Sequence, residues 1–333
     1  MFAHGHTRSA LLALSAFTYV LACTAAADET NGSSGLPAYR SNVSEVRVTF
    51  FATDENNHPL PTLTKADFAV VDNERVVRVF RSFTHSDETS LDVVVLLDLS
   101  ESVAPRLRAT IIDVLQLVAR ERSIPDDNVA VLSFGGTGGG MSGGTSGGLQ
   151  PAVLCSSGCR SSDSASKLLG VKGGGTTPLF DALIFGADFI AQHRRAGVRP
   201  VLILFSDDYD TISLHSAPEA LQAVLDEGAL IYSVDMGKSG NQSSNQGSGS
   251  MFLRRVSDAT GGRYFSFSVG SSRQDDDAAV LNAVLEDLHA SYVVTYDLPS
   301  HEAGFHSLRL LPTHNLNLTF HSRNGYYYEP NGR

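Results

Sequence analysis

The stretch formed by residues 91–102 constrains the fold of this chain more than any other. Its sequence, LDVVVLLDLSES, is an apolar run that is interrupted only by Asp92 and stops at Asp98. An apolar run without alternation is typical of a strand buried on both faces, as in a parallel sheet covered by helices. The stretch therefore predicts an α/β fold.

Three side chains at the end of this strand can face a single point. Asp98, Ser100 and Ser102 follow one another at two-residue spacing, in a segment that leaves the carboxyl end of the strand. Open α/β sheets bind their ligands at that end. The spacing predicts a ligand site, and the alternative is a strand-ending aspartate followed by a serine-rich helix cap.

Strand-like and helix-like segments alternate through the centre of the chain. The predicted strands cover residues 91–97, 128–134, 201–205, 230–234 and 263–267. The predicted helices cover residues 104–122, 179–193, 217–227, 251–260 and 278–290. Such alternation implies a doubly wound, mostly parallel sheet of Rossmann-like type. A further short strand at the edge is expected over residues 151–155.

Short β-like segments flank this core on both sides. They cover residues 46–52, 68–71 and 76–83 before it, and residues 292–298, 307–311 and 316–320 after it, followed by three tyrosines at 326–328. One interpretation is a small β module built from both ends of the chain, and the alternative is two independent edge additions. The predicted division is a signal peptide (1–27), a flexible linker (28–43), an N-terminal β-strand module (44–88), an α/β domain (89–290) and a C-terminal β segment (291–333) packing with 44–88.

The first 27 residues predict export. An apolar run over residues 10–22 follows a weakly basic start and precedes small residues up to Ala27, as in a secretory signal peptide. The alternative is a lipoprotein, because the sequence before Cys23 resembles a lipobox and Cys23 would then carry a lipid anchor. Both interpretations place the chain in the periplasm or outside the cell, with no transmembrane segment in the mature chain.

Either cleavage leaves Cys155 and Cys159 as the only pair of cysteines in the folded chain. In an oxidising compartment the segment CSSGC can close as a small local disulfide. A zinc site would need two further ligands, and the neighbouring residues offer none. The sequence therefore predicts a disulfide.

Charge and motifs narrow the range of partners. The net charge of −11, without clusters of Lys and Arg, argues against binding to nucleic acid or to anionic membranes. The glycine-rich segment 135–148 lacks the Gly-Lys-Ser/Thr ending of a phosphate cradle, so it is predicted to be a mobile surface loop rather than a nucleotide site. The eleven histidines are predicted to be solvated.

Two further segments are expected at the carboxyl end of the predicted parallel strands. Thr177 follows a run of glycines, and Asp207 follows the strand at 201–205. Together with Asp98, Ser100 and Ser102 they offer two carboxylates and three hydroxyls. Mg²⁺ prefers oxygen ligands and retains waters, so this set predicts a magnesium site with one position open to an outside oxygen. Ca²⁺ or Mn²⁺ is the alternative.

The segments DLSES, GGTTPLFDAL and FSDDYD resemble the three loops of a von Willebrand factor type A (VWA) domain with its metal-ion-dependent adhesion site (MIDAS). The resemblance covers roughly residues 90–290. It implies direct or water-mediated coordination of the metal by Asp98, Ser100, Ser102, Thr177 and Asp207.

Two positions qualify this resemblance. Thr177 is preferred to Thr176 because it stands four residues before Asp181, where the family's threonine usually lies. Many family members have glycine after the third-loop aspartate, whereas this chain has Asp208, an extra carboxylate that would strengthen metal binding or favour calcium. The flanking segments, with LTKADFAVVDNERVVRVFRSF and SYVVTYDL, are similar to exported VWA-related proteins from acidobacteria.

A binding module is the favoured hypothesis: a protein partner supplies an Asp or Glu that completes the coordination of the metal. The alternatives are a structural envelope protein whose metal only stabilises the loops, and a metal-dependent hydrolase. A phosphatase that used Asp98 as nucleophile would want a second acid at Ser100, and the sequence has no Gly-x-Ser-x-Gly elbow or HExxH. We therefore predict that the chain is not an enzyme. As in related adhesion domains, the last helix (278–290) is hypothesised to slide when the partner binds.

Overall fold

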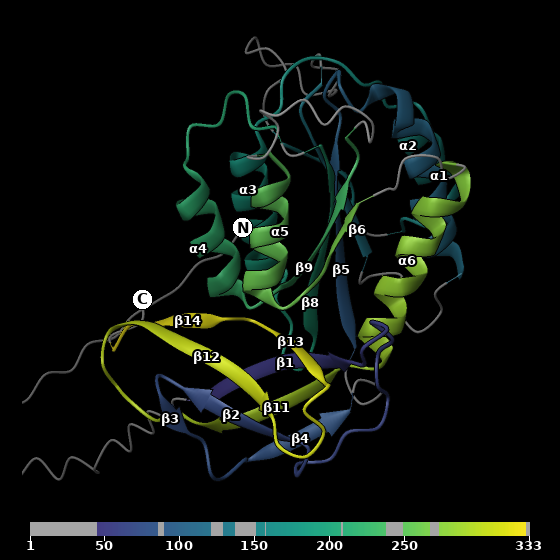
Figure 1. Ribbon diagram of the computed structural model, residues 1–333. Helices are drawn as coiled ribbons and strands as arrows, with labels where there is room; N and C mark the ends of the chain where they lie inside the picture. The colour runs from purple at the N-terminus through teal and green to yellow at the C-terminus, as the bar shows by residue number, and fades with distance from the viewer. Residues whose placement is uncertain are drawn as a thin grey trace, which may run out of the picture. The chain divides into compact units, whose positions relative to one another are not determined.

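The structure, a computed structural model, describes residues 45–85, 90–120, 129–136, 151–156, 158–207, 209–237, 249–266 and 273–330 (Figure 1). All of them belong to one compact unit, Val43–Arg333. The predicted signal peptide, the linker and Cys23 lie outside the described residues, as do Asp208 and residues 137–148 of the glycine-rich segment.

The strands are β1 (Glu45–Thr53), β2 (Phe68–Asp72), β3 (Arg75–Val76), β4 (Ser82–His85), β5 (Leu91–Asp98), β6 (Val129–Phe134), β7 (Ala152–Cys155), β8 (Arg199–Ser206), β9 (Leu230–Asp235), β10 (Tyr264–Ser266), β11 (Tyr292–Asp297), β12 (Gly304–Pro312), β13 (Thr319–Ser322) and β14 (Gly325–Tyr328). The helices are α1 (Ala104–Arg120), α2 (Ser162–Leu169), α3 (Leu179–Gln192), α4 (Ala217–Glu227), α5 (Gly249–Thr260) and α6 (Arg273–His289). Among the described residues, no helix has both the length and the apolar character needed to cross a membrane.

The central sheet has the strand order β10-β9-β8-β5-β6-β7 within the described ranges. Its neighbouring strands run parallel, except that β7 lies antiparallel to β6 at one edge. Helices α1, α2 and α6 cover one face of the sheet, and α3, α4 and α5 cover the other (Figure 1). The predicted α/β class with a doubly wound, mostly parallel sheet is confirmed.

Strand β5 shows why an unbroken apolar run was needed. Val93 and Val95 pack into the core on the side of α1 and α6, whereas Val94 and Leu96 pack against the helices of the opposite face. Because successive strand residues point to opposite faces, both sets must be apolar when both faces are covered.

The flanking strands form two further sheets, in the orders β13-β1-β11-β4 and β14-β12-β2-β3 for the part of the chain that is described. Strand β1 pairs with β11 and β2 pairs with β12, in both cases antiparallel, so each sheet joins segments from both ends of the chain. Residues of both sheets share one apolar cluster, in which the rings of Phe50 and Phe68 are 4.9 Å apart. The two sheets form a small β sandwich. The domain boundaries at 88/89 and 290/291 stay a prediction.

Two strands predicted in the flanks are wrong in their bounds. Residues 76–83 do not form one strand, because β3 pairs with β2 while β4 pairs with β11 in the other sheet, and the chain between them passes from one sheet to the other. Residues 316–318 lie outside β13: Leu316 is exposed, and the N–H of Leu318 donates to the carbonyl of Asn315 in a turn.

The prediction that the histidines are solvated is wrong for His306. Its side chain is 1 % exposed, and its Nε2 lies 2.8 Å from the carbonyl oxygen of Glu302. Its Nδ1 is 3.7 Å from Oδ1 of Asp72, whose Oδ2 accepts hydrogen bonds from Tyr296 and Tyr326 at 2.8 and 2.7 Å. The two tyrosine hydroxyls and the carbonyl of Glu302 provide hydrogen-bond partners for most of this buried cluster, whereas Oδ1 of Asp72 makes no hydrogen bond within the described residues.

A disulfide joins Cys155 and Cys159, which confirms the predicted pair. The bond links the end of β7 to the turn that precedes α2. Both residues are buried against the face of the sheet covered by α1 and α6.

His321 is expected to make the sandwich sensitive to acid. Its ring stacks on Phe51 with centroids 4.5 Å apart, and its Nε2 lies 3.1 Å from the hydroxyl of Thr53. Burial, together with the nearby charge of Arg263, lowers the pKa of His321 to about 4. The pKa of an unfolded histidine is about 6.5, so the neutral ring stabilises the fold fully above that pH, and this contribution is lost as the pH falls towards 4.

We therefore expect the free energy of unfolding in urea to fall between about pH 7 and pH 4 by about 2–3 kcal/mol more in the wild type than in His321→Gln. The amide of the variant keeps a polar partner for Thr53 but does not titrate in this range. Parallel pH profiles of the two proteins would contradict the assignment.

Candidate metal centre

The candidate site lies where the strand order of the central sheet reverses. From β5 the chain continues to β6 on one side, whereas β8, the neighbour of β5 on the other side, begins a run that continues to β9 and β10. Asp98 ends β5 and Ser206 ends β8. In open α/β sheets the loops that leave the strands on the two sides of such a switch point diverge and open a crevice. Strand order alone thus brings the first and third predicted loops together.

Asp98 is fully buried at this point. Its Oδ1 accepts a hydrogen bond from the backbone N–H of Ser100 at 2.8 Å, and its Oδ2 accepts one from the hydroxyl of Ser206 at 2.7 Å. The hydroxyls of Ser100 and Ser102 are hydrogen-bonded to each other at 3.1 Å. The structure therefore brings together the three predicted residues of the first loop. Ser206 is an additional residue of the site that the sequence analysis missed.

The second loop lies directly on the first. The N–H of Gly174 donates to the carbonyl of Leu99 at 2.7 Å, and the N–H of Glu101 donates to the carbonyl of Gly175 at 3.3 Å. These backbone bonds hold the two threonines that follow, Thr176 and Thr177, beside the loop of Asp98.

Gly135 is a second residue of the site that the sequence analysis missed, since the segment 135–148 was interpreted as a mobile surface loop. It has φ +74°, and a Cβ at this position would lie 2.7 Å from the carbonyl oxygen of Thr176 and 3.5 Å from Oδ1 of Asp98. Only glycine fits so close a backbone approach. The signal in the sequence was its place directly after the apolar strand β6, at the same edge of the sheet as Asp98.

The third loop contributes Asp207 and fixes Thr177. Thr177 is buried, its N–H donates to the hydroxyl of Thr211 at 2.9 Å, and its carbonyl accepts the N–H of Thr211 at 2.9 Å. Oδ1 of Asp207 is buried and makes no hydrogen bond within the described residues, and the same holds for the hydroxyl of Thr176. Two buried oxygens without partners are expensive unless a further group satisfies them.

The electrostatics of the site favour a cation. Burial raises the pKa of Asp98 to about 6, against the opposing effect of the hydrogen bonds from Ser100 and Ser206, and the charge of Asp207 adds to the rise. Two carboxylates that disfavour each other's ionisation are a suitable place for a divalent ion. All the donors are oxygens, as Mg²⁺, Ca²⁺ and Mn²⁺ prefer.

The donor set depends on hydroxyls as well as carboxylates. Across the described ranges there is no group of three or more His, Cys, Asp or Glu side chains that could hold a metal by themselves. The ligand set Asp98, Ser100, Ser102, Thr177 and Asp207 stays a prediction, as do the additional candidates Thr176 and Asp208.

The sequence model of the von Willebrand factor type A domain matches residues 92–295, which is more than half of the chain. The chain belongs to the von Willebrand factor type A family. Members of this family are mostly interaction modules and often bind a divalent metal at a MIDAS. A comparison with curated proteins found no match.

Several solved structures are similar to this VWA protein at low identity. Proximal thread matrix protein 1 from the mussel byssus is 13 % identical with a TM-score of 0.42, and the match covers 59 % of this chain and 48 % of that chain, about half its length. The manganese-loaded TRAP protein of Plasmodium vivax is 15 % identical with a TM-score of 0.40 (78 % and 99 % covered). The SpRpn10 VWA domain is 12 % identical with a TM-score of 0.41 (60 % and 97 % covered).

Asp181 holds the third loop of this VWA domain against the start of α3. Its carboxylate accepts the backbone N–H groups of Leu214 and His215 at 3.0 Å each, and its Oδ1 is 2.8 Å from Nδ1 of His215. Although partial burial disfavours the charge, these hydrogen bonds hold the pKa of Asp181 below its usual value. The ordered loop keeps Thr211 in place to bond Thr177.

Ser213 supports the same helix end. Its hydroxyl accepts the N–H groups of Phe180 and Asp181 at 3.0 and 3.1 Å and is itself hydrogen-bonded to Asp210. These are N–H groups of the first turn of α3, which has no side-chain cap of its own at Pro178. Substitution of Ser213 would therefore disturb the start of α3 and, through it, the loop that holds Thr177.

Proposed function

We propose that this chain is an exported adhesion module that captures a protein partner through a divalent cation. The cation would be held by Asp98, Ser100, Ser102, Thr177 and Asp207, directly or through water, and an Asp or Glu of the partner would complete its coordination. Magnesium is the preferred ion, with calcium or manganese as alternatives.

One observation carries this proposal: the buried Oδ1 of Asp207, which has no hydrogen-bond partner in the described chain, beside the buried carboxylate of Asp98. A structure that only used these residues as strand ends and helix caps would satisfy both carboxylates with N–H or O–H donors, as it does for Asp181. A bound cation would satisfy the open oxygen and relieve the repulsion between the two carboxylates.

The two carboxylates and three hydroxyls leave one position of an octahedral Mg²⁺ shell open, so a further oxygen can come from outside. The bound ion would supply the positive charge that a protein of net charge −11 otherwise lacks towards an acidic partner. The residues of the chain would orient the ion: Ser206 and the N–H of Ser100 fix the Asp98 carboxylate, and Thr211 fixes Thr177.

Exposed apolar side chains beside the site support a protein as the partner. The loop after β8 carries Tyr209, Ile212 and Leu214, which are 48 %, 41 % and 93 % exposed. The hydrogen bonds to Asp181 hold this loop in a fixed conformation, so the apolar groups are presented rather than folded inward. Large exposed apolar groups grouped on one loop mark interaction surfaces.

A capture experiment tests the proposal. The tagged chain, incubated with an extract of its native envelope in millimolar Mg²⁺, is expected to retain a partner that EDTA releases. Asp98→Asn is expected to retain none, because the site loses one of its two charged ligands, whereas Asp188→Asn, an exposed aspartate of α3, retains the partner fully. Capture that is the same in EDTA and in Mg²⁺ would reject the metal-dependent mode.

Export and membrane attachment are part of the proposal and rest on the sequence alone. Mass spectrometry of the mature N-terminus separates the two alternatives. A chain that begins at Asp28 would support soluble export, and an acylated Cys23 would support the lipoprotein. A mature protein that retains Met1 would contradict both.

A further inference from the structure

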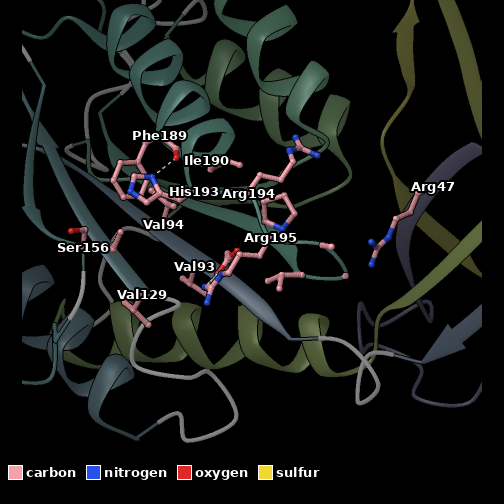
Figure 2. Close-up of a pocket in the computed structure, with 16 residues that line it drawn as sticks. Arg47, Val93, Val94, Val129, Ser156, Phe189, Ile190, His193, Arg194 and Arg195 are labelled. Carbon is pink, nitrogen blue, oxygen red and sulfur yellow. Dashed lines mark hydrogen bonds and ion pairs between the residues drawn. The ribbon is translucent and has the colours of Figure 1, made fainter. Parts of the chain in front are cut away.

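A cavity of about 420 Å³ lies at the amino ends of the central strands, opposite the end that carries the candidate metal centre (Figure 2). It is lined by the amino ends of β5, β6 and β8 and by the segment that joins α3 to β8. Asp92 lines it, whereas Asp98 ends the same strand, so cavity and candidate metal centre are separated by about 20 Å of extended chain. A ligand in this cavity would not touch the metal loops.

The floor of the cavity is apolar. It consists of Val93, Val94, Val129, Ala130, Phe189 and Ile190. All six side chains are largely buried in the core of the α/β domain and are therefore held rigidly. The volume falls within the range of about 300–1,000 Å³ that is usual for small-molecule sites, which are also mostly apolar.

The wall of the cavity is basic, in a chain whose net charge is negative. Arg47, Arg194, Arg195 and His193 line it, and Asp92 is the only carboxylate among the lining residues. Figure 2 shows Arg194 and Arg195 on the segment after α3, and Arg47 reaching from β1 on another side. Three guanidinium groups around one apolar floor favour a ligand with a negative charge and an apolar body.

Two of these arginines are already fixed by ion pairs. Arg194 pairs with the carboxylate of Glu227 and also donates to the backbone carbonyl of that residue at 3.0 Å. Arg195 pairs with Asp92. Because a guanidinium has five N–H donors, Arg194 keeps donors for a ligand while its ion pair holds its position. The wall is thus ordered before a ligand arrives.

Arg47 differs from these two. Its side chain is exposed, and its guanidinium makes no hydrogen bond or ion pair with the rest of the described chain. Its backbone is fixed, because its carbonyl accepts a hydrogen bond from Nη2 of the buried Arg323 at 2.9 Å. A cation on a fixed strand, facing a cavity and without an anion of its own, is available for a ligand.

We propose that this cavity binds a carboxylate attached to an apolar group. Arg47 binds the carboxylate, in the bidentate manner that its planar guanidinium allows, and the spare donors of Arg194 add to the attraction. The apolar body of the ligand lies on the floor formed by the strands. Such a ligand is either a short fatty acid or the C-terminal residue of a peptide.

Isothermal titration calorimetry of the full chain, with and without EDTA, tests this site. Decanoate and N-acetyl-leucine are the charged probes for the two sources, and decanol is the neutral control. At least one of the two carboxylates is expected to bind with one-to-one stoichiometry, and its affinity is expected to be the same with and without EDTA. If the fatty acid is the ligand, decanol is expected to bind at least about tenfold more weakly than decanoate. The tighter of the two carboxylates identifies the source. Absence of binding by both overturns the proposal.

Variants locate the binding. Arg47→Gln is expected to lower the affinity for the carboxylate by at least about tenfold. Arg108 is an exposed arginine of α1 outside the cavity, and Arg108→Gln is expected to leave the affinity unchanged. Ala196→Trp, at an exposed position of the wall, fills the cavity and is expected to abolish binding without lowering the melting temperature. Equal affinities of Arg47→Gln and Arg108→Gln would overturn the assignment.

Discussion

Millimolar Mg²⁺ is expected to raise the melting temperature of the wild-type chain by about 5–10 °C, and Asp98→Asn is expected to abolish this rise. An ion that binds only the native state stabilises it by about 2.7 kcal/mol when its concentration is a hundred times its dissociation constant. In a domain of this size one kcal/mol corresponds to about 2–4 °C. Differential scanning calorimetry in Mg²⁺ and in EDTA measures the difference.

The metal-free state provides a second comparison. In EDTA, Asp98→Asn is expected to be at least as stable as the wild type, because the amide removes a buried charge that Asp207 opposes and can still bond Ser100 and Ser206. Asp188→Asn should show the full rise of the melting temperature in Mg²⁺. If Asp98→Asn showed the same rise, the ion would not be bound at the candidate centre. The same measurement with Ca²⁺ and Mn²⁺ ranks the alternative ions.

The α/β core could be predicted because its signals are local. Helix α4 begins and ends where the sequence analysis placed it, since Ser216 and Glu219 form a capping box at its start and Gly228, with φ +63°, closes its end. Strands β5 and β8 were recognisable from their unbroken apolar runs, which only a sheet covered on both faces requires. These features need no knowledge of distant residues.

The β sandwich was harder to predict because its strands are defined by partners far along the chain. Residues 76–83 carry one alternating pattern, but which sheet each half joins depends on β2 and on β11, more than 200 residues later. His306 is buried for the same reason: its neighbours Asp72 and Tyr326 come from other parts of the sequence. Local polarity alone predicted solvent exposure.

The candidate site could be predicted in part, less fully than the α/β core and more fully than the β sandwich. The residue types of its three loops could be predicted from the sequence, because each follows directly on an apolar strand or a run of glycines. Gly135 and Ser206 also follow directly on apolar strands, but their roles could not be predicted, because these arise from contacts across the switch point: a backbone approach to Thr176 and a hydrogen bond to Asp98. Sequence spacing indicates which loops meet, but not which small residues let them meet.

The end of α6 is anchored in a way that bears on the hypothesis of a sliding last helix. Asp287, in the last turns of α6, is fully buried, and its two carboxylate oxygens accept hydrogen bonds from Nε and Nη2 of Arg263 at 2.7 and 2.8 Å. Arg263 also donates to the carbonyl of Asn57 in the sandwich. Movement of α6 along its axis would have to break this ion pair or move Arg263 together with the helix.

Arg263→Met is expected to lower the free energy of unfolding by about 3–5 kcal/mol, since it leaves the buried carboxylate of Asp287 without its partner. Burial already raises the pKa of Asp287 to about 7 against the opposing charge of Arg263. Without the arginine the pKa rises further. The variant therefore recovers stability as the pH falls, because the folded state takes up the proton. Urea unfolding at about pH 8 and pH 6 measures both effects.

The double variant Arg263→Met/Asp287→Leu separates the anchor from the fold. Two apolar side chains of similar size leave no buried charge, so most of the lost stability is expected to return. If α6 slides when the partner binds, the affinity for the partner in Mg²⁺ should change in this variant, because the intact ion pair opposes one of the two positions of the helix. An affinity equal to that of the wild type, with the Mg²⁺ stabilisation intact, would mean that α6 stays fixed and that the metal face binds as a rigid surface.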